Sequence, residues 1–170
     1  DGSHSWIRYS ARSFPEKDYL DAVVVDITER KQAEEIARNQ EARLSKVLEI
    51  APDAIVSTGE DLRINTFNKG AEEVFGWENA DVLGQPLDIL IPHGLRNVHA
   101  AHIKGFLASQ DESRQMSKRR DIPGLRKDGS VFPAQASISK LRLGEDTIFT
   151  VIMQDITDKK EADAELIAAK

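Results

Sequence analysis

One segment of this chain occurs almost twice, and this repeat constrains the architecture more than any other feature of the sequence. Each copy opens with Asp-Gly-Ser, continues through alternating apolar and polar residues, and closes with Asp-Ile-Thr before a charged run. The copies span residues 1–34 and 128–163. A repeat this long is a domain-scale unit and not a solenoid turn. Residues 44–127 precede only the second copy, so we expect the chain to begin within the last third of one domain and to contain a complete second domain.

The composition is typical of a globular domain joined to charged helical connectors. Of the 170 residues, 40% are apolar and 31% are charged, and the formal net charge is −6. The dense basic run at residues 118–120 has acidic neighbours, which favours a solvated loop over a nucleic-acid patch. No apolar run reaches membrane-spanning length, and no signal peptide is recognisable. We therefore expect a cytoplasmic segment without direct nucleic-acid or membrane contact.

The absence of cysteine excludes several chemistries. The chain can form no disulfide, thiolate–iron bond, iron–sulfur cluster or cysteinyl flavin adduct. Zinc would depend on histidine and carboxylate ligands, and no HExxH spacing occurs. Because G-x-S-x-G and P-loop motifs are also absent, we expect this chain not to be an enzyme.

Hydrophobic periodicity and turn residues predict an α+β fold. A strand hairpin and a long helix come first, followed by two strands, several short helices, one longer helix, three strands and a final helix. The predicted ranges, in that order, are 5–12, 19–26, 26–50, 54–58, 64–67, 68–76, 80–84, 87–91, 93–108, 114–122, 131–140, 147–154 and the residues after 155. A five-stranded antiparallel sheet with helices on one face satisfies this order.

Each Asp-Ile-Thr triplet lies where a strand is predicted to become a helix. Asp26 and Asp155 are predicted as N-caps that bind the first free backbone amides, and Thr28 and Thr157 follow them at each junction. A change inside the domain could move the output helix at the second junction, so we treat these four residues as candidate signal-junction residues. Residues 29–50 contain no Gly or Pro and carry a narrow apolar stripe, which favours a two-stranded coiled coil over a single helix on its own domain.

Six motifs, spaced in a fixed order, resemble the PAS sensor domain. They are Ala-Pro-Asp-Ala-Ile at 51–55, Phe-Asn-Lys-Gly-Ala-Glu at 67–72, Phe-Gly-Trp at 75–77, Val-Leu-Gly-Gln at 82–85, Arg-Lys-Asp-Gly-Ser-Val-Phe-Pro at 126–133 and Gln-Asp-Ile-Thr at 154–157. The resemblance implies a PAS fold, a sensing role, homodimerisation through flanking helices, and an output domain in cis such as a histidine kinase or diguanylate cyclase. PAS domains bind heme, flavin, small acids or nothing, so the fold alone does not give the ligand.

The same resemblance divides the chain into four segments. Residues 1–28 resemble the last strands of a preceding PAS domain, and residues 29–50 form a helical linker. Residues 44–157 resemble a complete PAS domain, and residues 158–170 begin an output helix. The parent protein is therefore expected to contain PAS domains in tandem.

The helix predicted at residues 93–108 contains the sharpest candidate site. Leu95, His99, His102 and Phe106 follow a four-three-four spacing, so we expect both histidines on the stripe that faces the interior. Neutral imidazole is a common axial ligand of heme iron. This helix is therefore the first place to look for a cofactor site.

This helix resembles the proximal helix of FixL-type oxygen-sensor PAS domains, which read Arg-x-x-His-x-x-aromatic. On that resemblance Arg96 matches the arginine, His99 matches the heme ligand, and His102 takes the aromatic position. Arg120 matches the distal arginine and Ile138 an apolar residue of the oxygen pocket. The resemblance implies heme b and a gas or redox signal.

The chain also departs from that pattern. One additional residue separates His99 from Arg120, and Ala136 is smaller than the aliphatic residue that it replaces. Gln115 or Met116 takes the place of an apolar pocket residue, and His102 offers a competing imidazole. Two alternatives therefore stay open: a ligand-free dimerisation and relay domain, and a domain that binds flavin or a small metabolite.

Overall fold

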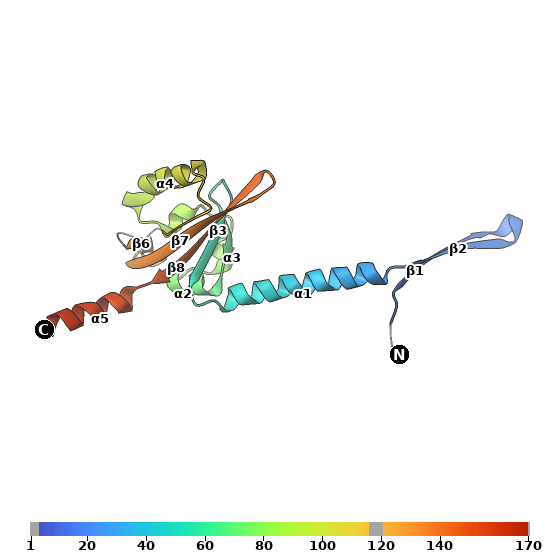
Figure 1. The fold of residues 1–170 in the computed structure, drawn as a ribbon, viewed down its shortest axis with the longest axis horizontal. Coiled ribbons are helices and arrows are strands. Elements are labelled where there is room, and N and C mark those ends of the chain that lie inside the picture. Colours follow the sequence, from blue (N-terminus) through green and yellow to red (C-terminus); the bar gives the residue numbers. More distant parts are fainter. Residues whose placement is uncertain (1–3, 116–120, 170) are drawn as a thin grey trace. The chain divides into compact units, whose positions relative to one another are not determined.

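The computed structural model describes residues 4–115 and 121–169, and its ribbon is drawn in Figure 1. The chain divides into two compact units, Asp1–Lys46 and Val47–Lys170. Among the described residues, no helix is long and apolar enough to span a membrane.

The first unit contains a hairpin and most of a long helix. Strands β1 (Ile7–Phe14) and β2 (Tyr19–Asp26) pair antiparallel. The 3₁₀ turn η1 (Pro15–Lys17) joins them and ends at Asp18, whose φ of 52° is left-handed. Helix α1 (Thr28–Ile50) follows and has no buried residue. The predicted hairpin and helix are present, whereas a coiled-coil partner stays a prediction.

The second unit is built on an antiparallel sheet of six described strands. They are β3 (Ala54–Thr58), β4 (Ile64–Phe67), β5 (Ser113–Gln115), β6 (Ile122–Leu125), β7 (Val131–Leu143) and β8 (Asp146–Asp155). The order is β4-β3-β8-β7-β5, and β6 also pairs with β7. The sheet exceeds the expected five strands because the segment predicted as one strand contributes both β5 and β6, on either side of residues 116–120. The predicted α+β class is confirmed.

Short helices cover one face of this sheet. They are α2 (Lys69–Phe75), α3 (Asn79–Val82), η2 (Leu87–Leu90), η3 (His93–Leu95) and α4 (Arg96–Ala108). The helix predicted at 93–108 therefore begins as a 3₁₀ turn, and α4 starts only at Arg96. After β8 the chain continues into α5 (Thr157–Ala168).

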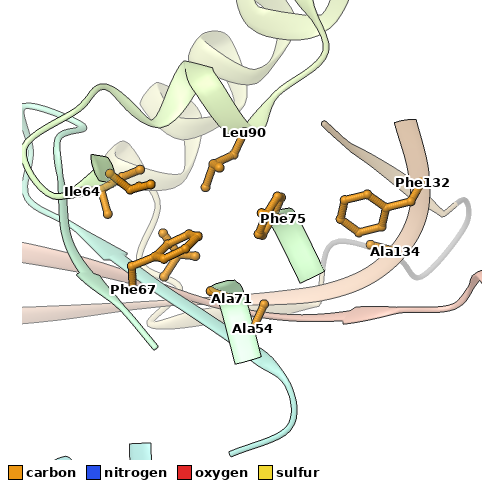
Figure 2. Close-up of a cluster of buried hydrophobic side chains, with 10 residues drawn as sticks. Ala54, Ile64, Phe67, Ala71, Phe75, Leu90, Phe132 and Ala134 are labelled. Carbon is orange, nitrogen blue, oxygen red and sulfur yellow. The ribbon is translucent and has the colours of Figure 1, made fainter. Parts of the chain in front are cut away.

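The core lies between these helices and the inward face of the sheet. Phe75 of α2 lies with its ring centroid 6.1 Å from that of Phe67 and 5.4 Å from that of Phe132 on β7 (Figure 2). A second cluster joins Ile103 and Phe106 of α4 to Ile138 of β7. Because Phe132 and Ile138 occupy the same face of β7, α2 and α4 pack on the same side of the sheet.

Asn68 fixes the start of α2. Its Oδ1 accepts hydrogen bonds from the amides of Ala71 at 2.9 Å and Ile55 at 2.8 Å, and its Nδ2 donates to the carbonyl of Leu48 at 2.9 Å. Gly76 ends the helix with a φ of 72°, which suits a residue without a Cβ. Local cap residues therefore set both ends of α2.

Candidate functional site

A cavity of about 420 Å³ lies between α4 and the sheet. Its walls are mainly apolar, and among the described residues the polar side chains that line it are those of His99, His102 and Arg114. This volume falls within the range of small-molecule sites, about 300–1,000 Å³. The second unit can thus hold a ligand that is largely apolar.

The structure brings five of the six predicted cofactor-binding residues to this cavity. Leu95, His99, His102 and Phe106 line it from η3 and α4, and Ile138 lines it from β7. The sixth, Arg120, lies outside the described residues. Helical spacing found the α4 residues, and only the family resemblance pointed to Ile138, which lies far from them in the sequence.

The two histidines differ in burial. His99 is partly buried and shares a stripe of α4 with the buried Ile103 and Phe106, whereas His102 is exposed at the edge of the cavity. Burial lowers the pKa of His99, the nearby His102 lowers it further, and Asp88 partly opposes the shift. The His99 imidazole is therefore neutral at pH 7, and this is the form that binds metals.

The donor set suits a metal held within a macrocycle better than a free ion. Among the described residues, no group of three or more His, Asp or Glu side chains could hold a metal ion. Heme iron needs only one or two axial ligands from the protein, because the porphyrin supplies the others. A single neutral imidazole on an apolar wall meets that requirement.

Arg114 is a cavity residue that the sequence did not reveal. It lies on β5 opposite Ile138, and its guanidinium carbon is 5.4 Å from the Phe106 ring centroid. Its Nη2 donates to Asp111 at 2.8 Å. A positive charge therefore lies at the wall of a mainly apolar cavity, where it could bind an acidic group of a ligand.

Asp155 holds the junction between β8 and α5. Its Oδ1 accepts hydrogen bonds from the Thr157 amide at 2.9 Å and the Thr157 hydroxyl at 2.6 Å, and its Oδ2 accepts one from Arg126 at 2.7 Å. Asp155 lies one residue before the N-cap, Ile156, which makes no side-chain cap bond. Asp155 was predicted as the N-cap, but it lies one residue earlier in the chain. It still binds the first amide of the helix, because a short Asp side chain reaches the amide two residues ahead.

Arg126 extends this junction into the domain, and the sequence did not assign it that role. Its Nη1 donates to the carbonyl of Val74 on α2 at 2.7 Å, and its guanidinium lies 4.2 Å from the Phe132 ring centroid. One side chain thus connects α2, the core and the start of α5.

The first copy of the repeat has the same junction. The Asp26 carboxylate accepts hydrogen bonds from the Thr28 amide at 2.8 Å and the Thr28 hydroxyl at 2.6 Å. The Ile27 amide donates to the carbonyl of Trp6 at 2.8 Å, as the Ile156 amide donates to that of Pro133 at 3.0 Å. Asp26 also precedes its helix by two residues, because α1 begins at Thr28. The sequence repeat is therefore a repeat of backbone geometry.

The family model for the PAS fold matches residues 42–156. This chain belongs to the PAS family. The PAS resemblance is confirmed, and the chain contains a sensory domain of the kind found in signalling proteins.

Similar proteins include two named sensors. The chain is 31% identical over 148 residues to the sensor protein FixL of Bradyrhizobium diazoefficiens, covering 87% of this chain and 29% of that protein. It is 26% identical over 117 residues to the oxygen sensor protein DosP of Escherichia coli, covering 67% and 14%. The chain thus spans less than a third of these relatives.

Solved PAS structures share the fold. The PAS domain of a Colwellia psychrerythraea protein superimposes with a TM-score of 0.61 at 23% identity, covering 69% of this chain and 97% of that one. The PAS domain of an HTR-like protein from Haloarcula marismortui also gives 0.61, at 22% identity, covering 74% and 99%. At these identities the likeness establishes the fold alone.

Proposed function

We propose that this PAS domain binds one heme b in the cavity between α4 and the sheet and relays its state to α5. The observation that carries the proposal is His99, a partly buried imidazole whose lowered pKa keeps it neutral on an apolar wall. His99 would be the axial ligand, and Leu95, Phe106 and Ile138 would surround the macrocycle. Heme supplies a site for a diatomic gas or a change of redox state. Two relatives named as sensors, one of them for oxygen, support this choice.

Other residues around the cavity would tune the site. Arg114 provides a cation for an acidic edge of the ligand, and Arg120 remains our candidate for the distal side. The exposed His102 is the competing imidazole. Mutation can distinguish an axial imidazole from a cationic side chain. Loss of the axial imidazole changes the visible absorption spectrum, whereas loss of an arginine lowers the affinity for the ligand.

The relay would run through Asp155 to α5. Ala134 pairs with Asp155, so a shift of β7 changes the position of the carboxylate that binds the first turn of α5. An output domain in cis, such as a histidine kinase or diguanylate cyclase, would receive the change. Helix α1 would carry the homodimer contact, because it exposes apolar side chains. These are Ile36, Leu44, Val47 and Ile50.

The hairpin β1–β2 would belong to a second PAS sheet. Its register from Ile7 opposite Asp26 matches that from Ala134 opposite Asp155 in the complete domain. In the complete domain, β3 and β5 flank the equivalent strands. Tandem PAS domains in the parent protein would supply those neighbours.

The test is a visible absorption spectrum during titration with hemin, before and after reduction. We expect a Soret band that saturates at one heme per chain, that is lost or displaced in His99→Ala, and that persists in His102→Ala. If His99→Ala binds heme stoichiometrically with an unchanged spectrum, the ligand assignment is wrong.

A ligand-free relay is the second candidate, and the exposed apolar stripe of α1 favours it. In that case hemin would stay free in the titration, and the domain would act by dimerising and passing a signal between helices. Sedimentation that shows a monomer at micromolar concentration would count against this role.

A further inference from the structure

Lys140 is a buried charge on the inward face of β7. The neighbouring inward residues are Phe132, Ala134, Ala136 and Ile138, all apolar, and Lys140 is only 8% exposed. A lysine is rarely buried to this extent unless hydrogen bonds satisfy its ammonium group. Its position within an apolar row therefore needs a physical explanation.

The C-terminal end of α4 supplies the hydrogen-bond acceptors that satisfy this ammonium group. The Lys140 Nζ donates to the carbonyl of Phe106 at 3.0 Å and to that of Ser109 at 2.8 Å, and it lies 3.5 Å from the carbonyl of Leu107. The last carbonyls of a helix form the negative end of its dipole. The Phe106 carbonyl also accepts hydrogen bonds from the Ser109 amide at 3.2 Å and the Ser109 hydroxyl at 2.9 Å. The three N–H donors of one ammonium group thus cap α4 from the sheet.

Lys140 also contacts the segment after α4. Its backbone amide donates to the carbonyl of Glu112 at 2.7 Å, and its Nζ lies 4.9 Å from the Phe106 ring centroid. The opposite end of α4 is held differently, because the N-cap residue Leu95 makes no side-chain cap bond. The helix is therefore fixed by charge at one end and uncapped by a side chain at the other.

We infer that Lys140 is a positioning residue that fixes the C-terminal end of α4 on β7 and transfers a displacement of α4 to the sheet when the cavity is filled. His99 lies about 10 Å from the fixed end, at about 1.5 Å per residue. A ligand on His99 acts on the uncapped half of α4, and the ammonium passes the resulting strain to β7. Since β7 pairs with β8 as far as Asp155, the strain reaches the start of α5. This inference rests on the proposed function, because it requires a ligand in the cavity.

The test is hydrogen exchange, followed by mass spectrometry, of the whole chain with and without one equivalent of hemin. Lys140→Met removes the donors while keeping a side chain of similar length. Lys104→Met is the matched control, since it removes an exposed lysine from α4, the helix that Lys140 contacts. Lys140→Gln retains a shorter donor and serves if Lys140→Met does not fold.

Without hemin, we expect the amides of residues 106–112 in Lys140→Met to exchange at least about tenfold faster than in the wild type. Lys104→Met should match the wild type. With hemin, the wild type should change its exchange in α5, whereas Lys140→Met should bind hemin with less than half of that change. Lys140→Gln should deviate in the same direction by a smaller factor.

Two results would overturn the inference. One is unchanged exchange at residues 106–112 in both Lys140→Met and Lys140→Gln. The other is faster exchange there with a full hemin response in α5, which would mean that Lys140 stabilises α4 without transmitting anything. Failure of the proposed function has a different signature: the wild type itself takes up no hemin, and the transfer role then falls with it although the exchange contrast remains.

Discussion

The hairpins β1–β2 and β7–β8 share a register but not an environment. In each, the Asp of an Asp-Ile-Thr triplet closes the second strand and binds the first turn of the next helix. Leu20 and Phe149 occupy the same place before their triplets, yet Leu20 is 61% exposed and Phe149 is 3% exposed. Local sequence is therefore sufficient for the hairpin and its junction, whereas burial depends on neighbours that lie elsewhere in the sequence.

The largest difference in stability should come from truncating Phe149 and Leu20, the two side chains that occupy matching positions. Phe149→Ala should lower the free energy of unfolding of the complete domain by about 3–5 kcal/mol, because it opens a cavity against Phe106. Leu20→Ala should change it by less than about 0.5 kcal/mol, since its side chain is exposed. Urea denaturation followed by circular dichroism measures both. A loss from Leu20→Ala as large as that from Phe149→Ala would show that the hairpin is buried in solution.

Removing the Asp side chain at each strand-to-helix junction should have the second-largest effect on stability. Asp155→Ala should cost about 1–2 kcal/mol of domain stability, because it removes the bonds to Thr157 and leaves the partly buried Arg126 without its carboxylate. Asp26→Ala should have the smaller effect, visible as fraying of α1 in amide exchange, since the Asp26 side chain is exposed. Equal losses would mean that Arg126 adds nothing to the second junction.

The turns of the two hairpins offer a finer contrast. Gly144 has a φ of 65°, and the corresponding turn of β1–β2 uses Asp18 at 52°. Gly144→Ala should cost about 1 kcal/mol, because a Cβ disfavours the left-handed region. Asp18→Gly should stabilise its hairpin by a few tenths of a kcal/mol, seen as slower amide exchange in β1 and β2. Tolerance of Ala at Gly144 would indicate that this turn relaxes to another conformation.

The smallest expected effect is a pH dependence that distinguishes the two histidines of α4. Because the pKa of His99 is lowered, the unfolded chain binds a proton near the ordinary value of 6.5 while the folded domain resists it. Stability from this group is fully present above about pH 6.5 and decreases as the pH falls through the folded-state pKa. The melting temperature of the wild type should fall more than that of His99→Gln between pH 7.5 and 5.5. His102→Gln should keep most of the wild-type fall, because burial of His99 is a larger cause of the shift than the nearby His102.

Much of the fold follows from short-range patterns. Strands β2, β3 and β4 begin and end where the sequence predicts, since alternation and turn residues act over a few positions. The segment 114–122 was predicted as one strand. Its two described ends belong to separate strands, β5 and β6, which both pair with β7. The stripe on α4 indicated one face of the helix, but its spacing could not distinguish the partly buried His99 from the exposed His102.

The residues that were missed are those whose partners lie far away in the chain. Arg126 contacts Val74 and Asp155, and Lys140 contacts Phe106, so no local pattern reveals either set of bonds. For Lys140 a signal was present: it falls on the apolar face of an alternating strand, where a charge requires buried partners.

The sequence by itself determined the repeat, the hairpins, the strand-to-helix junctions and membership of the PAS family, because these depend on backbone conformation and hydrogen bonds between residues a few positions apart. The tertiary structure alone decided which histidine is shielded, that Arg114 reaches the cavity and which carbonyl groups bind the ammonium group of Lys140. Burial and charge pairing arise only when strands and helices that are distant in the sequence pack together, and that packing changes the free energy of each polar group.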